Sequence, residues 1–267
     1  MAYLRDIKAL IIDMDGVLWR DNEPIVILSK LFDDIRNFPL KFVLATNNST
    51  RSIKQYQQRL AELGAVVHQH EILTSGLATA LVLRSRYPLG GNVFVVGEAG
   101  LVETLSEHGF KHSTEKPLAV VAGLDRQINY EKLKLASGFI RNGAAFIATN
   151  PDKTLPTPQG FVPGAGAVLA FIEAATDTKP EVIGKPFPTL LNAAIEIMQV
   201  LPEQVLAIGD RLDTDIAGAQ AAGCMTSLVL SGVSTETEGL AWSPTIDLIS
   251  PDISKVIDIL HELTDGR

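Results

Sequence analysis

The sequence predicts an α/β protein whose parallel sheet carries helices on both faces. Two observations lead to this fold class. Short, continuous apolar runs alternate along the chain with longer amphipathic segments, and such runs are typical of strands buried on both faces of a sheet. The length of 267 residues and the hydrophobic fraction of 46% suffice for one large domain or two ordinary ones.

The first and last parts of the chain contain the elements of the main domain. Each of its expected strands is a continuous apolar run, and these runs lie at 9–12, 42–45, 182–184 and 205–208. Its expected helices have amphipathic spacing and lie at about 52–63, 188–200 and 214–222. Gly64 and Gly223 follow two of these helices, as glycine commonly does at a helix end. We therefore expect a Rossmann-like core.

The middle of the chain alternates in the same way on its own. Its expected strands lie at 93–96, 118–121 and 145–148, and its expected helices at 101–108 and 130–141. Roughly 100 residues with several elements can form a separate core. We therefore predict a core of residues 1–77 and 180–267 and an inserted α/β domain of residues 78–179. The hinges are expected near residues 75–76 and 178–180.

Charge and cysteine content exclude several classes of partner and compartment. The net charge is −8 and the isoelectric point is about 5.2, so the surface repels phosphate backbones and nucleic acid is not expected as a main partner. No stretch approaches the roughly 20 apolar residues that span a bilayer, and no membrane association is expected. Cys224 is the single cysteine, which suits a buried thiol in a reducing, cytoplasmic compartment.

Polar residues follow three of the expected strands. The strand at 9–12 is followed by 13–17 (DMDGV), the strand at 42–45 by 46–50 (TNNST), and the strand at 205–208 by 209–215 (GDRLDTD). The carboxyl ends of neighbouring parallel strands line the ligand crevice of an open α/β sheet. If the strands are neighbours, five side chains converge there: Asp13, Asp15, Thr46, Asp210 and Asp215. Lys185 follows the strand expected at 182–184 and would join them.

The chemistry of this cluster follows from charge. Several carboxylates held close together repel one another unless a cation is present, and an all-oxygen ligand set suits Mg²⁺. Lys185 could neutralise a phosphate, and Thr46 and Asn47 could donate hydrogen bonds to its oxygens. Each segment alone has an ordinary explanation as a turn or helix cap, but their joint occurrence favours phosphoryl transfer.

Over essentially its whole length the chain resembles the haloacid dehalogenase superfamily of phosphatases, in its NagD-like, 4-nitrophenylphosphatase branch. The four motifs of that superfamily match 13–17 (DMDGV), 46–48 (TNN), 184–186 (GKP) and 209–216 (GDRLDTDI). Cap segments match at 123–126 (GLDR), 148–152 (ATNPD) and 163–166 (PGAG). The resemblance places an α/β cap between the second and third motifs.

The resemblance implies roles for the acidic residues. Asp13 would be the nucleophile that forms an aspartyl-phosphate, and Asp15 would protonate the leaving oxygen and then activate water. Mg²⁺ would be held by the Asp13 carboxylate, the Asp15 backbone carbonyl and Asp210. Asp215 would orient a metal-bound water or Lys185.

Phosphate binding is implied for a second group of residues. Thr46, Asn47 and Asn48 would hold the phosphoryl group, and Lys185 would neutralise it. Asp15 favours phosphoryl transfer over carbon–halogen cleavage, because the dehalogenases of the superfamily lack this second acid.

The expected function is a Mg²⁺-dependent phosphomonoesterase. Its substrate would be a small phosphorylated metabolite, such as a sugar phosphate or a nucleoside monophosphate, with aryl phosphates as substrates in vitro. The alternative is a receiver-like signalling module that accepts a phosphoryl group without turnover. A receiver needs about half this length, has no inserted cap and does not need the acid at Asp15.

Two further features concern specificity and assembly. The loop 150–155 is the expected contact between the cap and the substrate, because it follows an apolar strand and carries polar groups. Trp19 follows the first motif, where a gate over the site and plain packing are both open. A homodimer formed through the cap is a further expectation.

Overall fold

The computed structural model describes residues 2–157 and 160–265, and it divides into two compact units. The core unit comprises Met1–Thr46, Tyr56–Leu73 and Lys185–Arg267, and the inserted unit comprises Asn47–Gln55 and Thr74–Gly184. Each unit has a parallel sheet of its own. The α/β fold class with an inserted α/β domain is therefore confirmed.

The sheet of the core unit has the order β15-β14-β13-β1-β4-β5. Its strands are β1 (Ala9–Ile12), β4 (Lys41–Thr46), β5 (Ile72–Thr74), β13 (Val205–Gly209), β14 (Met225–Val229) and β15 (Leu248–Ser250). The central strand β1 pairs in parallel with β13 on one side and with β4 on the other. Chain order reverses at β1, and ligands of open α/β sheets bind outside the strand ends at such a point.

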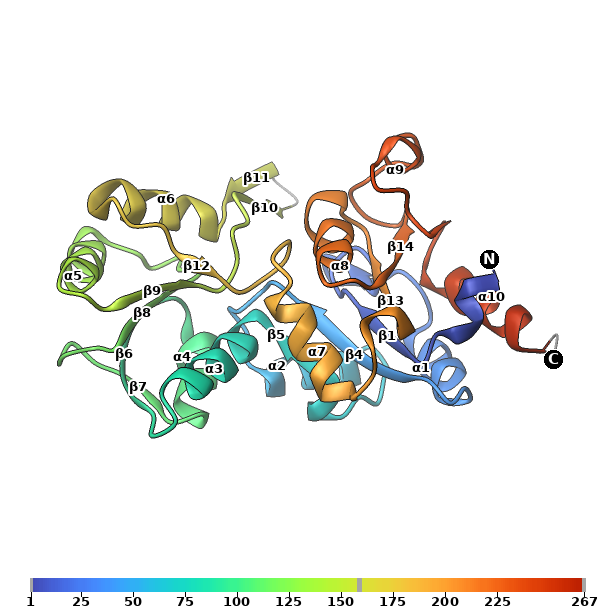
Figure 1. Ribbon diagram of the computed structural model, residues 1–267, viewed down its shortest axis with the longest axis horizontal. Coiled ribbons are helices and arrows are strands. Elements are labelled where there is room, and N and C mark those ends of the chain that lie inside the picture. Colours follow the sequence, from blue (N-terminus) through green and yellow to red (C-terminus); the bar gives the residue numbers. More distant parts are fainter. Residues whose placement is uncertain (1, 158–159, 266–267) are drawn as a thin grey trace. The chain divides into compact units, whose positions relative to one another are not determined.

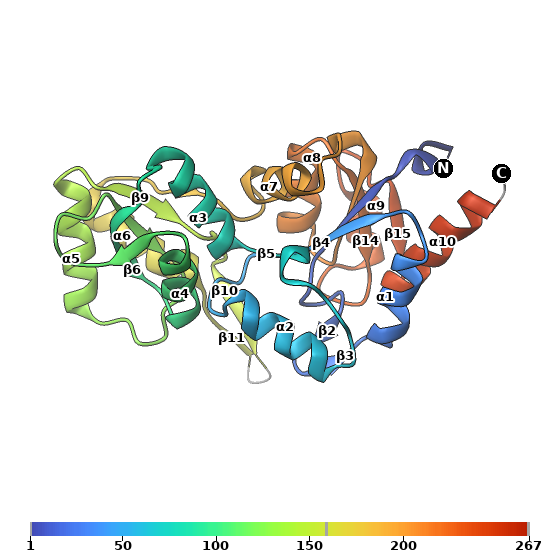
Figure 2. The ribbon, with the colours of Figure 1, turned by 90° about the horizontal axis from the view of Figure 1, so that it is seen from below.

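Helices cover both faces of this sheet. They are α1 (Leu28–Arg36), α2 (Ile53–Glu62), α7 (Thr189–Met198), α8 (Ala217–Ala221), α9 (Glu236–Ala241) and α10 (Ile253–Asp265). Figure 2 shows α7 and α8 on one face and α1 and α10 on the other. All four residues of β1 are buried, as expected for a strand packed on both faces, and this explains its continuous apolar sequence.

The sheet of the inserted unit has the order β12-β9-β8-β6-β7. Its strands are β6 (Gly91–Val96), β7 (Phe110–His112), β8 (Ala119–Ala122), β9 (Ala145–Ala148) and β12 (Glu181–Val182). In Figure 1, α5 (Tyr130–Arg141) and α6 (Ala165–Thr176) lie on one face, and α3 (Ser75–Arg86) and α4 (Ala99–Glu107) lie on the other. A hairpin of β10 (Thr154–Thr157) and β11 (Gly160–Pro163) precedes α6.

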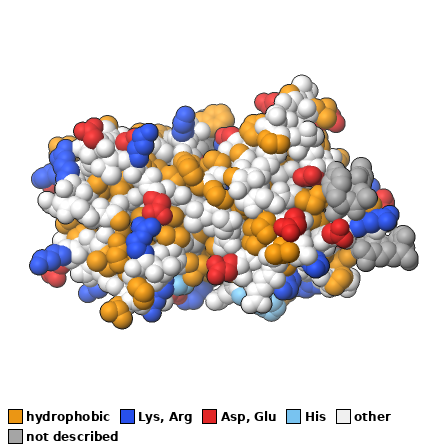
Figure 3. All heavy atoms as spheres, viewed as in Figure 1, with side chains coloured by type: hydrophobic (Ala, Val, Ile, Leu, Met, Phe, Trp, Pro, Cys, Tyr) orange, Lys and Arg blue, Asp and Glu red, His pale blue; other side chains and the backbone are white. Residues whose placement is uncertain are grey.

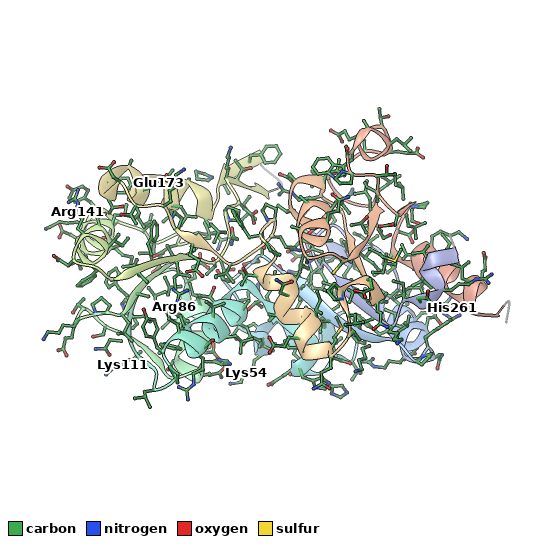
Figure 4. The ribbon with its side chains drawn as sticks, viewed as in Figure 1. Lys54, Arg86, Lys111, Arg141, Glu173 and His261 are labelled. Atoms are coloured by element: carbon green, nitrogen blue, oxygen red, sulfur yellow. The ribbon has the colours of Figure 1, made fainter. Side chains whose placement is uncertain are left out.

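The boundaries of the inserted unit differ from the predicted 78–179. Residues 47–55, 74–77 and 180–184 also belong to it. Of the apolar run predicted as a core strand at 182–184, Val182 belongs to β12, and β12 pairs with β9 through Glu181 and Ile147. Arg86 of α3, labelled in Figure 4, forms an ion pair of 2.8 Å with Glu181. These contacts hold the returning chain in the inserted unit as far as Gly184.

Surface charge is mixed on the face drawn in Figure 3. Lys and Arg side chains there are dispersed among acidic and apolar ones and do not gather into one basic surface.

Across residues 2–157 and 160–265, no helix combines the length and apolar character needed to cross a membrane.

Candidate active site

Three aspartates meet at the carboxyl ends of β1 and β13. Asp13 follows β1, and its backbone N–H donates to the carbonyl of Ile208 at 2.9 Å. Asp210 follows β13, and Asp215 lies in the π-helical turn Leu212–Ile216. One carboxylate oxygen from each of the three lies within 4.8 Å of the others. Because β1 and β13 are neighbours, three of the five side chains predicted to converge, Asp13, Asp210 and Asp215, form one cluster.

Glycines make room for this cluster. Gly16 has a φ of +82°, and a Cβ there would lie 2.4 Å from Oδ2 of Asp210. A Cβ at Gly232 would lie 1.9 Å from the same oxygen, and a Cβ at Gly209 would lie 2.2 Å from the Cβ of Asp215. Side chains at these three positions would therefore displace the carboxylates. The backbone N–H of Val233 also donates to Oδ2 of Asp210, at 2.8 Å.

Lys185 is buried among these carboxylates. Its ammonium lies 2.5 Å from Oδ1 of Asp13 and 2.6 Å from Oδ1 of Asp215, and it donates to the carbonyl of Ala45 at 3.2 Å. Burial by itself lowers the pKa of Lys185, but the two ion pairs outweigh burial and raise it. Lys185 is therefore a protonated cation at the strand ends, as predicted, although it follows a strand of the inserted unit.

When all three are ionised, the carboxylates carry more negative charge than Lys185 neutralises. Burial raises the pKa of Asp13 well above its usual range, and the opposing effect of Lys185 does not cancel this. Burial and the neighbouring Asp215 raise the pKa of Asp210 to about 7. Three ionised carboxylates beside one ammonium leave two negative charges. This excess and the all-oxygen donor set fit a divalent hard cation such as Mg²⁺.

Asp215 is oriented by its own contacts. Its Oδ1 accepts from Lys185, and its Oδ2 accepts from the backbone N–H of Arg211 at 3.1 Å. Both oxygens thus have partners in the protein. Of the two expected roles, orienting a metal-bound water or orienting Lys185, the ion pair fits the second, and the role stays a prediction.

Asp15 lies outside the three-carboxylate cluster. Its side chain is exposed, and its Oδ1 accepts a hydrogen bond of 2.7 Å from the indole N–H of Trp19. The exposed carboxyl of Asp15 therefore lies two positions after Asp13 in the chain and faces solvent. The predicted metal contact of Asp15 is through its backbone carbonyl, and it stays a prediction.

The three residues predicted to hold phosphate divide between the units. Thr46 is buried at the end of β4 in the core unit. Asn47 and Asn48 belong to the inserted unit. The Asn47 amide donates to both oxygens of Asp152 at 3.3 Å, and Oδ1 of Asn48 accepts from the N–H and hydroxyl of Thr50 at 2.9 and 2.7 Å. Oδ1 of Asn48 therefore closes a local turn, and phosphate binding by these residues remains a prediction.

Comparison with known proteins identifies the family. A model of haloacid dehalogenase-like hydrolases matches residues 10–111, and a HAD-hydrolase-like model matches residues 182–256. The chain is 36% identical to an acid sugar phosphatase of Staphylococcus saprophyticus, over 97% of this chain and 100% of that relative. The chain belongs to the haloacid dehalogenase-like hydrolases.

Solved structures agree with this family and indicate the branch. A 4-nitrophenylphosphatase of Thermotoga maritima matches with a TM-score of 0.91 and 31% identity, over 97% of this chain and 99% of that one. NagD of E. coli K-12 matches with a TM-score of 0.86 and 36% identity, over 93% and 98%. A glycerol phosphate phosphatase of Mycobacterium tuberculosis, solved in complex with magnesium, matches with a TM-score of 0.87 and 31% identity, over 96% and 78%. The protein is therefore a NagD-like phosphatase of this family, and its named relatives do not favour the receiver-like alternative.

The loop 150–155 of this phosphatase has contacts that its sequence did not predict. Asn150 is buried, and its amide donates to the backbone carbonyl of Asn47 at 2.8 Å. Its Oδ1 accepts from the backbone N–H of Asp152 at 3.1 Å. Asn150 therefore holds the loop together inside the inserted unit. Leu155 lies on the hairpin strand β10 and is half-buried, and a role of the loop in substrate selection stays a prediction.

Sequence reasoning missed the segment that follows β14. Ser231 donates from its hydroxyl to the carbonyl of Gly16 at 2.7 Å, and Gly232 packs on Asp210. The signal was available, since the apolar run of β14 ends at small and polar residues as the other site strands do. It also missed the hydrogen bond between Trp19 and Asp15, because neither gating nor packing implies it.

Proposed function

We propose that this phosphatase is a Mg²⁺-dependent phosphomonoesterase that acts through an aspartyl-phosphate at Asp13. The observation that carries the proposal is the buried contact of 2.5 Å between the Asp13 carboxylate and the Lys185 ammonium. The ion pair fixes one oxygen of Asp13 and places a positive charge beside it. A phosphoryl group arriving at Asp13 would meet that charge, which stabilises the negative oxygens of the transition state.

The proposed reaction uses two acids, Asp13 and Asp15. A carboxylate oxygen of Asp13 attacks phosphorus, the bond from phosphorus to the ester oxygen breaks, and protonated Asp15 gives its proton to that oxygen. Asp15, now ionised, removes a proton from a water molecule, which attacks phosphorus and releases phosphate and free Asp13. Asp15 ends the cycle protonated, so the proton balance closes.

Mg²⁺ would be held by the carboxylates of Asp13 and Asp210 and by the backbone carbonyl of Asp15. When bound, it supplies positive charge that neutralises the phosphoryl oxygens and the acidic cluster. Asp215 holds Lys185 in place through the 2.6 Å ion pair, and the hydroxyl of Thr46 is assigned to a phosphoryl oxygen.

The proposed substrate is a small sugar or polyol phosphate. Support comes from the relatives, one of which is named an acid sugar phosphatase and another a glycerol phosphate phosphatase. Nucleoside monophosphates are the competing class. Steady-state rates of phosphate release with sugar, polyol and nucleoside monophosphates separate the two. Higher kcat/KM for the nucleotides would overturn the substrate assignment without affecting the phosphatase chemistry.

The experiment that tests the mechanism is chemical trapping of the phospho-enzyme. The protein is mixed with 4-nitrophenyl phosphate and Mg²⁺, quenched, and reduced with borohydride, which converts an acyl phosphate of aspartate into homoserine. Peptide mass spectrometry should find homoserine at position 13, and Asp13→Asn should show neither homoserine nor turnover. Asp213→Asn is the matched control, because Asp213 lies in the same acidic loop but its side chain is 68% exposed. Homoserine at another position, or full turnover in excess chelator, would contradict the proposal.

A further inference from the structure

A buried indole holds the carboxyl group of Asp15. The Nε1–H of Trp19 donates to Oδ1 of Asp15 at 2.7 Å. The Trp19 side chain is fully buried, whereas Asp15 is exposed. The donor is therefore fixed by packing while the carboxyl that it holds faces solvent. Within the described part of the chain, no hydrogen bond is recorded to the other oxygen, Oδ2.

The backbone between the two residues doubles back to make this contact. The carbonyl of Met14 accepts from the backbone N–H groups of Leu18 at 2.8 Å and of Trp19 at 3.4 Å, and Gly16 donates to the carbonyl of Trp19 at 2.8 Å. This close return needs the left-handed backbone of Gly16, whose φ is +82°. Ser231 fixes the carbonyl of Gly16 from the neighbouring loop. The indole thus returns to Asp15 through a tight and well-braced turn.

Arg59 braces the other side of the indole. Its guanidinium carbon lies 4.4 Å from the centre of the Trp19 ring, and its guanidinium donates to the backbone carbonyl of Asp21. Arg59 belongs to α2, which lies beside the short strands β2 (Trp19–Arg20) and β3 (Glu23–Pro24) in Figure 2. A cation over an indole face is an attractive arrangement. The ring is therefore held by its face as well as by its N–H.

The chemistry of an indole N–H decides which carboxyl oxygen carries the proton. Indole nitrogen is a donor only and has no acceptor function. Oδ1 of Asp15 must therefore remain an acceptor whether the carboxyl is ionised or protonated. In a protonated carboxyl the carbonyl oxygen is a better acceptor than the hydroxyl oxygen, so the hydrogen bond at Oδ1 favours the transferable proton on Oδ2. A general acid works best when its proton is already on the oxygen that faces the leaving group.

We propose that Trp19 is a positioning residue for the general acid, and that it keeps the transferable proton of Asp15 on Oδ2. The inference rests on the proposed function, because it takes Asp15 as the acid that protonates the leaving oxygen. It differs from a gate, which would act on substrate entry. It also differs from plain packing, for which the ring alone would suffice.

The test is Trp19→Phe, which keeps an aromatic ring and removes the N–H. The values of kcat/KM are measured for 4-nitrophenyl phosphate, a good leaving group, and for phenyl phosphate, a poorer one that needs the acid more. Trp19→Phe should lower kcat/KM for phenyl phosphate about tenfold more than for 4-nitrophenyl phosphate, a part of the roughly 10²–10⁴-fold typical of general acids. A reduced fraction of folded enzyme lowers both rates equally, so the ratio of the two rates is independent of folding.

Three further variants make the result decisive. Trp242→Phe is the matched control, because the indole of Trp242 also donates to a side chain, Gln220, at 3.1 Å, and its ratio should equal that of the wild type. Asp15→Asn should change the ratio more than Trp19→Phe does. Adding Trp19→Phe to Asp15→Asn should change the ratio no further, because the two act as one unit.

The outcomes separate this inference from the proposed function. Equal losses on both substrates in Trp19→Phe, with a changed ratio in Asp15→Asn, would overturn the positioning role alone. An unchanged ratio in Asp15→Asn would remove the general acid and with it the mechanism. A changed ratio in the double variant relative to Asp15→Asn would show that Trp19 acts on the reaction by another route.

Discussion

Asp210 is a buried acid whose ionisation works against the metal-free fold, and Asp210→Asn tests this. The residue is only 2% exposed, and burial together with Asp215 raises its pKa from the ordinary 3.8 to about 7. An acid whose pKa is raised on folding stabilises the folded state at low pH. This contribution is lost as the pH rises through the pKa of the folded state. A rise of the pKa from 3.8 to about 7 corresponds to a loss of about 4 kcal/mol of stability between about pH 4 and pH 7.

The substitution removes this cost without removing the acceptor. The Oδ1 of asparagine can still accept from the backbone N–H of Val233, which donates to Asp210 at 2.8 Å in the wild type. The new amide N–H₂ needs acceptors, and a buried donor without one costs about 1–3 kcal/mol. We therefore expect metal-free Asp210→Asn to be more stable than the metal-free wild type by about 1–3 kcal/mol at about pH 8. The difference should shrink as the pH falls toward about 4, where Asp210 is protonated.

Urea unfolding in chelator, followed by circular dichroism across this pH range, measures the difference. Excess Mg²⁺ should then reverse the order, because the wild type gains stability from metal binding and the variant gains little. Asp213→Asn, in the same loop but exposed, should show neither effect. A metal-free variant less stable than the wild type at about pH 8, or a difference that does not vary with pH, would refute the charge-repulsion argument.

Three other predictions concern the lysine, a glycine and the thiol. Lys185→Met should lower kcat by about 100-fold or more in steady-state assays, because the charge beside Asp13 is lost; near-normal kcat would contradict its role. Gly16→Ala should weaken Mg²⁺ binding in calorimetric titrations, because its Cβ would lie 2.4 Å from Oδ2 of Asp210, whereas Gly64→Ala, with a similar φ of +83° and nothing within 4 Å, should not. Burial raises the pKa of the Cys224 thiol to about 12, so a chromogenic disulfide reagent should label it only after unfolding; rapid labelling of the native protein would show an open site.

Local sequence determined most of the fold and the core of the site. Four-residue apolar runs such as Ala9–Ile12 are typical of central strands buried on both faces, and α5 occupies the predicted range, Tyr130–Arg141. The polar residues after β1 and β13 could be placed together because parallel strands end at the same edge. Asp13, Asp210 and Asp215 accordingly form one cluster. Charge alone then indicated a divalent cation.

The tertiary structure decided those features that depend on contacts between residues far apart in the sequence. An apolar run does not specify which sheet it joins, so β12 was predicted in the core and pairs instead with β9. The hydrogen bonds from the Asn47 amide to Asp152, more than 100 residues away, could not be predicted from the local sequence. The indole of Trp19 meets Asp15 only because Gly16 turns the backbone and Arg59 packs on the ring. Local patterns of apolar and charged residues predict the strands, the helices and the polar residues at strand ends. Strand order and packing in three dimensions determine which of these residues are in contact.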